Sequence, residues 1–143
     1  MNVVLSENIE CIDWAELVRI FEGAPLGRRE PVKLEKAFRN SLYKCFVHSE
    51  EVLIGAGRAI SDGVTYAIVF DVVVRADFQG QGVGTAIVNW LIESSRKDEI
   101  PKVLLYSVPG KEGFYKKLGF RHMKTAMGIF TNPTWHITHG YIE

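Results

Sequence analysis

The chain has few cysteines and no excess of charge of either sign. Only two of its 143 residues are cysteine, Cys11 and Cys45, and they lack the CxxC spacing of a zinc or redox site. We therefore expect two buried thiols, with a disulfide as the alternative. Seventeen basic residues balance 17 acidic ones, so the net charge favours neither a nucleic-acid nor a membrane partner.

Targeting patterns and long apolar runs are also missing. The first ten residues, MNVVLSENIE, lack a basic segment followed by an apolar one, and the most apolar stretch, residues 67–74, is short and broken by Asp71. We expect a cytoplasmic protein. Since no repeat, low-complexity tract or linker interrupts the chain, we expect one domain over residues 1–143.

Apolar periodicity and turn residues predict the order of secondary structure. We expect strands at residues 2–5, 43–48, 52–60, 66–74, 103–107 and 127–130, with residues 136–142 as a further strand or a tail. We expect helices from Asp13 to Gly23 and Pro25, from Pro31 to about Asn40, over residues 82–97 and over residues 110–118. An antiparallel first half followed by a strand-helix-strand crossover is typical of an α+β fold.

Three glycines at alternate positions, Gly80, Gly82 and Gly84, lie between the predicted strand 66–74 and the helix that follows. The first N–H groups of a helix are unpaired and the helix dipole is positive there, so a phosphate is the expected ligand. Two nucleotide-binding fingerprints do not fit, because no Lys-Ser or Lys-Thr follows and Thr85 replaces the third glycine of G-x-G-x-x-G. A tight turn with close helix packing is the alternative.

Two motifs together resemble those of the GCN5-related N-acetyltransferases. Gln79-x-x-Gly82-x-Gly84 is similar to that family's Q/R-x-x-G-x-G/A loop, which binds the pyrophosphate of acetyl-CoA, and residues 113–120, GFYKKLGF, resemble its F-Y-x-x-x-G-F segment. The resemblance implies the family's α+β (mixed α/β) fold, with a mostly antiparallel twisted sheet of about six to seven strands and about four flanking helices. It also implies that the fourth and fifth strands splay apart around the cofactor.

Acetyl-CoA is the cosubstrate that the resemblance implies. Backbone N–H groups of the glycine loop would hold its pyrophosphate, and the valine strand before the loop would bond the pantetheine arm and the acetyl carbonyl. Lys111 stands where many members use an asparagine to hold the cofactor. The implied cofactor-binding residues are Val72, Val73, Val74, Gln79, Gly80, Gln81, Gly82, Val83, Gly84, Thr85, Lys111 and Tyr115.

Acetyl transfer to an amine needs a neutral nucleophile, a polarised carbonyl and a proton for the departing thiolate. The resemblance implies that Tyr115 supplies the proton or a hydrogen bond, with packing of its short helix as the alternative. Asp71 is the candidate general base through a water, or it satisfies neighbouring backbone donors. His48, Tyr106 and Glu22 are weaker candidates for the base.

The string Asp71–Val74 followed by Gln79–Gly82 particularly resembles glucosamine-phosphate and arylalkylamine N-acetyltransferases. The sugar-phosphate enzymes carry acidic residues where this chain has Tyr106, Ser107 and Val108, which argues against a sugar-phosphate acceptor. In this family the acceptor usually contacts the regions that correspond to residues 25–30 and 131–139.

The acceptor regions contain basic and aromatic side chains whose roles stay open. Arg28 and Arg29 would contact an acidic acceptor or be solvated. Trp135 would line an aromatic acceptor pocket or hold the tail against a second subunit, since family members are often homodimers and the C-terminus is apolar and aromatic. The histidines His122, His136 and His139 lack companions at ligand spacing, so we expect no metal.

We therefore expect an acetyl-CoA-dependent N-acetyltransferase that acts on a primary amine of a small molecule by direct attack in a ternary complex. Two alternatives are a non-catalytic acyl-CoA-binding or regulatory module and a protein N-acetyltransferase. Nucleic acid and membranes are not expected partners.

Overall fold

The computed structural model describes residues 2–24 and 26–143. The chain forms two compact units, Met1–Leu105 and Tyr106–Glu143. The single domain expected over residues 1–143 stays a prediction.

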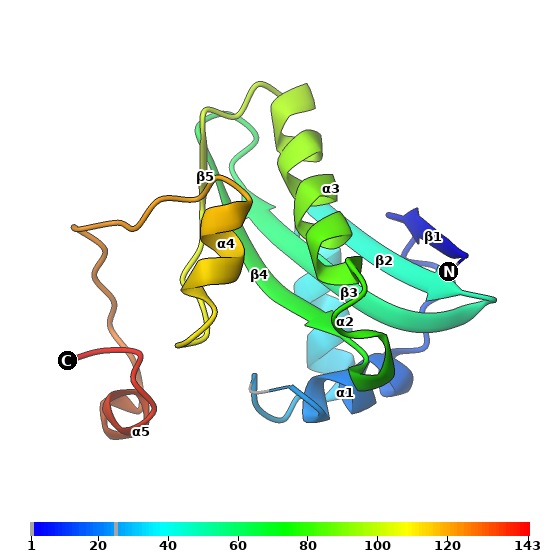
Figure 1. Ribbon diagram of the computed structural model, residues 1–143, viewed down its shortest axis with the longest axis horizontal. Helices are drawn as coiled ribbons and strands as arrows, with labels where there is room; N and C mark the ends of the chain where they lie inside the picture. The colour runs from blue at the N-terminus through cyan, green and yellow to red at the C-terminus, as the bar shows by residue number, and fades with distance from the viewer. Residues whose placement is uncertain (1, 25) are drawn as a thin grey trace. The chain divides into compact units, whose positions relative to one another are not determined.

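The first unit contains a five-stranded sheet and its helices (Figure 1). Its elements are β1 (Val3–Ser6), α1 (Trp14–Glu22), α2 (Pro31–Arg39), β2 (Tyr43–Ser49), β3 (Val52–Ser61), β4 (Tyr66–Val74), the 3-10 turn η1 (Ala76–Phe78), α3 (Val83–Lys97) and β5 (Lys102–Leu104). The strands lie in the order β1-β2-β3-β4-β5; the first four are antiparallel neighbours and β5 runs parallel to β4. The predicted mixed α/β class and the order of elements up to β5 are confirmed.

The first two helices begin where their sequences predict. Asp13 caps α1, and its Oδ1 accepts a hydrogen bond from the N–H of Glu16 at 3.1 Å. Pro31 occupies the first position of α2, where its missing N–H costs nothing. Helix α1 ends at the C-cap Gly23, whereas Pro25 lies outside the described residues.

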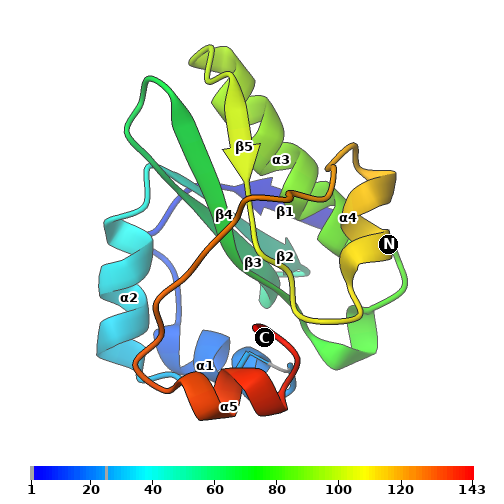
Figure 2. The same cartoon turned by 90° about the vertical axis from the view of Figure 1, so that its left-hand side faces the viewer.

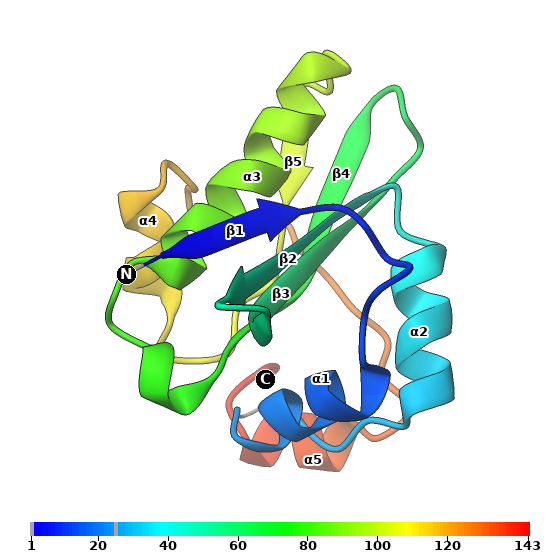
Figure 3. The same ribbon diagram turned by 90° about the vertical axis from the view of Figure 1, so that its right-hand side faces the viewer.

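Helices cover both faces of the sheet, α1 and α2 on one face and α3 on the other (Figures 2 and 3). Phe46 of β2 is buried with α1 and α2, while its neighbours Cys45 and Val47 are buried with Ile87 and Leu91 of α3. This alternation follows from the two-residue period of a strand. The sheet is therefore the middle layer of three, with a core on each side.

Two glycines of β3 let α3 approach the sheet closely. A Cβ at Gly57 would lie 2.5 Å from Cγ2 of Ile87 on α3. A Cβ at Gly55 would lie 2.9 Å from the carbonyl oxygen of Val73 on β4 and 3.1 Å from Cδ1 of Ile87. Neither the 2.5 Å nor the 2.9 Å contact is tolerated in a packed core, so glycine is required for this packing.

Strand β4 carries a bulge at Asp71. Ala56 pairs with Val73 and Arg58 with Phe70, so between these pairs β4 has one residue more than β3. Asp71 has a φ of 57°, in the left-handed region that Asp tolerates better than most residues. Because β5 pairs with residues 66–68 of β4, the bulged half of β4 runs on past the end of β5.

The second unit contains α4 (Glu112–Lys117) and α5 (Pro133–Thr138). The strand predicted at residues 127–130 is wrong, because these residues form neither helix nor strand and Met127 and Ile129 are 98% and 103% exposed. A strand requires a neighbour for its backbone hydrogen bonds, which an apolar pattern alone does not provide. Residues 136–142 are likewise no strand, since α5 extends into them. The part of the chain that the structure describes therefore has five strands and five α-helices, rather than the expected six to seven and four.

Both thiols are free, and their burial differs. Cys45 lies in the core, as predicted, but Cys11 is exposed in the turn before α1, so the prediction of two buried thiols is wrong for Cys11. Among the described residues, no helix is long and apolar enough to span a membrane.

Candidate active site

The glycine loop after β4 adopts the backbone that its sequence suggests. Gly80 and Gly82 have φ values of 75° and 86°, which other residues resist. A Cβ built at either position meets no atom within 4 Å. At these two positions glycine is therefore needed for the left-handed backbone conformation. It is not needed for close packing, because the surface there is open.

This open surface around Gly80 and Gly82 lies at the N-terminus of α3, a helix of 15 residues. Gly82 is its N-cap, and no side chain of the described residues caps this end. The N–H groups of Val83, Gly84 and Thr85 have no carbonyl four residues earlier within the helix. Unpaired donors at the positive end of a helix dipole fit a pyrophosphate.

Side chains of the loop hold it to the strand and the turn before it. Nε2 of Gln79 donates to the carbonyl of Val74 at 3.0 Å, and Nε2 of Gln81 donates to the carbonyl of Asp77 at 3.2 Å. The guanidinium of Arg75 contacts both carboxylate oxygens of Asp77 at 2.7 Å. These contacts restrain the loop, and a restrained loop loses less entropy when it binds a ligand.

Val72, Val73 and Val74 lie on the bulged end of β4. Val73 packs in the core beneath α1 and α2, whereas Val72 and Val74 pack against the α3 core. The side chains of these valines are therefore used for packing. Because this part of β4 continues past the end of β5, its backbone groups have no neighbour in β5 and could form hydrogen bonds with a ligand.

Asp71 is paired with two arginines, Arg29 from the loop between α1 and α2 and Arg58 from β3. Its Oδ2 accepts hydrogen bonds from Nε of Arg58 at 2.7 Å and from Nη1 of Arg29 at 3.2 Å, and its Oδ1 accepts one from Nη2 of Arg29 at 2.9 Å. The Asp71 side chain is only 6% exposed. Asp71 as the general base stays a prediction, and these contacts add a second possible role, because both oxygens are already acceptors for guanidinium groups.

Arg58 is the residue that the sequence analysis missed. It comes from β3, is 13% exposed, and donates also to Oγ of Ser41 at 3.2 Å. A lone arginine inside the apolar strand 52–60 and a lone aspartate inside the apolar strand 66–74 were the available signal. Buried charges are paired, so two such strands in one hairpin predict an ion pair.

Lys111 and Tyr115 both belong to the second unit. Lys111 is the N-cap of α4, and Tyr115 follows one turn later with its ring 4.9 Å from the ring of Phe114 and 5.8 Å from that of Phe120. Burial raises the pKa of the Tyr115 phenol, so the group is protonated at neutral pH and able to donate.

The weaker candidates for the base are spread over the chain. His48 lies half-buried on β2, where burial lowers the pKa of its imidazole, so it is neutral at pH 7. Glu22 is exposed at the end of α1, and Tyr106 begins the second unit, where Trp135 also lies, on α5. Within residues 2–24 and 26–143, no group of three or more metal-ligating side chains is placed to hold an ion.

Comparison with known proteins identifies the family of the chain. Residues 41–122 match the model of the acetyltransferase (GNAT) domain. An uncharacterized N-acetyltransferase, ycf52, of Porphyra purpurea is 43% identical over 137 residues, which cover 92% of this chain and 78% of that protein. Serotonin N-acetyltransferase 2, chloroplastic, of Oryza sativa subsp. japonica is 33% identical over 113 residues, 76% of this chain and 56% of that protein.

A solved structure shares the fold. The crystal structure of SA2161, a probable acetyltransferase of meticillin-resistant Staphylococcus aureus, superimposes with a TM-score of 0.79 at 23% identity, covering 90% of this chain and 98% of that one. The family model spans both the glycine loop and the F-Y segment, and several relatives are more than 30% identical to the chain. The chain belongs to the GCN5-related N-acetyltransferase family and is an acyltransferase.

Proposed function

We propose that the protein transfers an acetyl group from acetyl-CoA to a primary amine of a small molecule, by direct attack in a ternary complex. The observation that carries the proposal is the glycine loop: two open, left-handed glycines at the uncapped start of a long helix. Acetyl-CoA, when bound, supplies a thioester whose acetyl group an amine can accept.

In this proposal the residues Gln79–Thr85 bind the pyrophosphate through backbone N–H groups, and Lys111 adds a cation. The backbone of Val72–Val74 bonds the pantetheine arm and the acetyl carbonyl, polarising it. Tyr115 gives the departing thiolate a proton or a hydrogen bond. Partial burial raises the pKa of its phenol, so the group keeps its proton at neutral pH, and because it is then a weaker acid the hydrogen bond is the favoured role. For Asp71, the two guanidinium contacts favour a positioning role over proton acceptance.

Calorimetric titration with acetyl-CoA, beside CoA and ATP, tests the cofactor. We expect acetyl-CoA and CoA to bind and ATP to bind more weakly, and Gly82→Val to abolish binding of both. Gly63→Val is the matched control, because Gly63 has a similar φ of 76° but lies in the β3–β4 turn. Failure of acetyl-CoA to bind, or equal loss in both variants, contradicts the proposal.

Tyr115→Phe separates an enzyme from a binding module. We expect it to lower the rate of CoA release with an amine by about 10²- to 10⁴-fold, while the Kd for acetyl-CoA changes little. A module without catalysis releases no CoA with any amine and is indifferent to this change. Acetylated peptides detected by mass spectrometry, with no small amine accepted, would favour a protein substrate.

The compartment and the assembly are part of the same proposal. The cytoplasmic location stays a prediction, and the Oryza relative, which is named chloroplastic, supports a plastid as the alternative. The homodimer also stays a prediction, and light scattering after size-exclusion chromatography tests it.

A further inference from the structure

The cluster around Asp71 holds more positive charge than negative. One carboxylate receives two guanidinium groups, those of Arg29 and Arg58, and the side chains of all three are 30% exposed or less. A partly buried cation without a full counter-charge is costly. The cluster therefore favours an anion at whichever of its surfaces is open.

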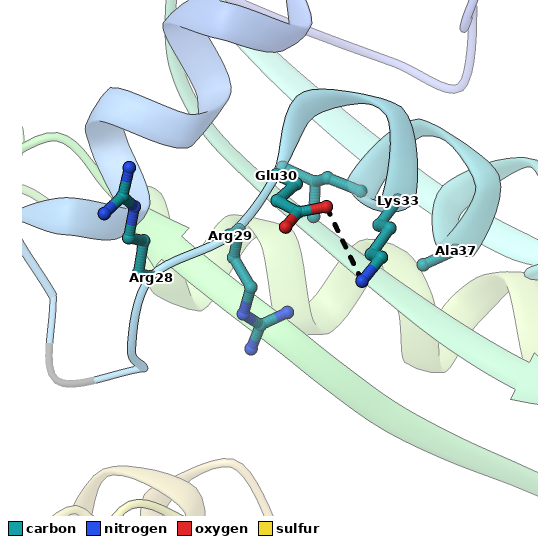
Figure 4. A pocket seen from close by; sticks show the side chains of 6 residues that line it. Arg28, Arg29, Glu30, Lys33 and Ala37 are labelled. Carbon is teal, nitrogen blue, oxygen red and sulfur yellow. Dashed lines mark ion pairs between the residues drawn. The ribbon is translucent and has the colours of Figure 1, made fainter.

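The open surface is a hollow of about 200 Å³ beside the loop between α1 and α2 (Figure 4). Its lining residues are Arg28, Arg29, Glu30, Lys33, Leu34 and Ala37. In Figure 4 the side chains of Arg29 and Lys33 extend to the same side of the loop, whereas Arg28 extends away from them. Leu34 is buried beneath, so the hollow combines an apolar base with two cationic groups.

The charges around the hollow do not cancel. With Arg28 left out because it extends away, Arg29, Lys33 and the supporting Arg58 carry three positive charges, against two negative charges on Glu30 and Asp71, which leaves one in excess. The whole chain, by contrast, is neutral. The Glu30–Lys33 pair is 3.5 Å long and well exposed, so Lys33 can leave Glu30 for an incoming anion at little cost.

Arg29 is fixed in place before any ligand binds. Its Nη1 and Nη2 donate to Asp71, Nη2 donates also to the carbonyl of Leu26 at 3.3 Å, and its guanidinium lies 4.8 Å from the centre of the Phe21 ring. These contacts use three of the five N–H groups of an arginine. A rigid guanidinium with donors to spare loses little entropy when it binds a carboxylate or phosphate.

The hollow is connected through Arg29 and Asp71 to β4, the strand that we propose binds the acetyl group. Arg29 contacts Asp71, and Asp71 directly precedes Val72 on the bulged end of β4. A volume of about 200 Å³ is below the roughly 300–1,000 Å³ of sites that enclose a whole ligand, so one group of a ligand fits it.

We propose that this hollow binds an anionic group, a carboxylate or a phosphate, of the acceptor, with Arg29 and Lys33 as the specificity-determining residues and Asp71 as the residue that positions Arg29. The inference rests on the proposed function, since it names the class of amine that the enzyme acetylates. It assigns the acceptor as an amine that also carries a negative charge.

The hollow itself is tested without catalysis, by calorimetry with inorganic phosphate and with acetate. When acetyl-CoA is found to bind, the titration is run on protein saturated with CoA, so that the glycine loop is occupied. We expect Arg29→Gln and Lys33→Gln each to weaken binding about tenfold, the usual effect of a lost charge-assisted hydrogen bond. Lys36→Gln, on the same helix but outside the hollow, is the matched control.

The Arg29→Gln variant leaves Asp71 paired with Arg58, and Lys33 is exposed, so both variants are expected to fold. Anion binding that is absent, or that survives both substitutions, overturns the hollow as an anion site. That result leaves acetyl-CoA binding, and with it the proposed function, untouched.

The acceptor is tested with matched amines: ornithine beside putrescine, phenylalanine beside phenethylamine, and phosphoethanolamine beside ethanolamine. We expect kcat/KM to be about tenfold higher for the anionic member of at least one pair, and Arg29→Gln to raise its KM while leaving that of the neutral member unchanged. The carboxylate and phosphate pairs distinguish the two sources of charge. Equal turnover within every pair, or turnover of none, overturns the assignment of an anionic acceptor.

Discussion

Each of the two compact units of the chain is stabilised internally by a different kind of contact. All the side chains of the hydrophobic core lie between Ile12 and Ile100, on the two faces of the sheet. None of residues 106–143, all of which the structure describes, is fully buried, although some, such as Tyr115, are partly buried. In that second unit the contacts are local, such as the stacked rings of Trp135 and His139, whose centres are 3.9 Å apart.

This difference implies that ligand binding and proton donation, the two parts of the proposed chemistry, belong to units of different stability. The glycine loop and the anion hollow belong to the unit with a core on both sides of its sheet. Tyr115, the proposed acid, belongs to the unit with little buried area, and buried apolar area is the main source of stability. Binding is therefore expected to be more robust than proton donation when the fold is perturbed.

Hydrogen exchange should show the largest contrast. We expect amides of β2, β3 and β4 to exchange at least about 1,000-fold more slowly than those of residues 121–130, which form neither helix nor strand. Exchange measured by mass spectrometry on the full chain checks this. Similar protection in both segments would show that the comparison is wrong.

Removal of the Asp71 carboxylate should break the first unit. Asp71→Ala leaves two guanidinium groups facing each other, and the loss of one partner of a buried ion pair costs about 3–5 kcal/mol in the free energy of unfolding. Urea denaturation measures it. Asp71→Asn, which tolerates the left-handed backbone and keeps one acceptor, should cost less.

The control for Asp71 lies in the second unit. Glu112→Gln changes an exposed carboxylate whose contact, to the N–H of Gly110, an amide oxygen can replace, so we expect a change within about 0.5 kcal/mol. Equal effects of Asp71→Ala and Glu112→Gln would mean that the cluster contributes nothing to stability.

The same substitution should have opposite effects in the two units. Gly57→Ala places a Cβ 2.5 Å from Ile87 and should destabilise the protein by about 1–3 kcal/mol, as overpacked cores do. Gly113→Ala, in α4 with no atom within 4 Å, should stabilise that helix by about 0.5–1 kcal/mol. Thermal unfolding followed by circular dichroism compares them, and a loss at Gly113 would contradict the open surroundings assigned to it.

The reactivity of the two thiols measures how well the core is protected, without any substitution. Burial raises the pKa of Cys45 to about 12, whereas Cys11 is exposed. At pH 8 we expect an aromatic disulfide reagent to modify one thiol of the native protein quickly and the second only after denaturation. Rapid modification of both would show that the α3 face of the core opens easily.

The sequence predicted the first unit closely because two independent signals agree there. The turn residues 61–63 and the apolar run after them predicted β4 at residues 66–74, and Asp13 and Pro31 marked the starts of α1 and α2. The same reasoning failed at residues 127–130. An apolar run is consistent with a strand, but a strand forms only where another strand offers hydrogen bonds.

In the candidate site, too, features local in the sequence were predicted and contacts between distant residues were not. The motif Gln79-x-x-Gly82-x-Gly84 is local, so the sequence could identify both the turn and its proposed ligand. Arg58 and Asp71 are 13 residues apart, and Arg29 and Asp71 are 42 apart. Their meeting depends on the pairing of β3 with β4 and on the bulge, which no single segment reveals.

The sequence by itself determined the elements of the first unit, the left-handed glycine turn and the family, because each depends on neighbouring residues in the chain. Only the tertiary structure decided that Asp71 is shared by two arginines, that Gly55 and Gly57 admit α3, and that the hollow beside Arg29 carries excess positive charge. The physical reason is that charge pairing and close packing act through space, between segments that the sequence separates.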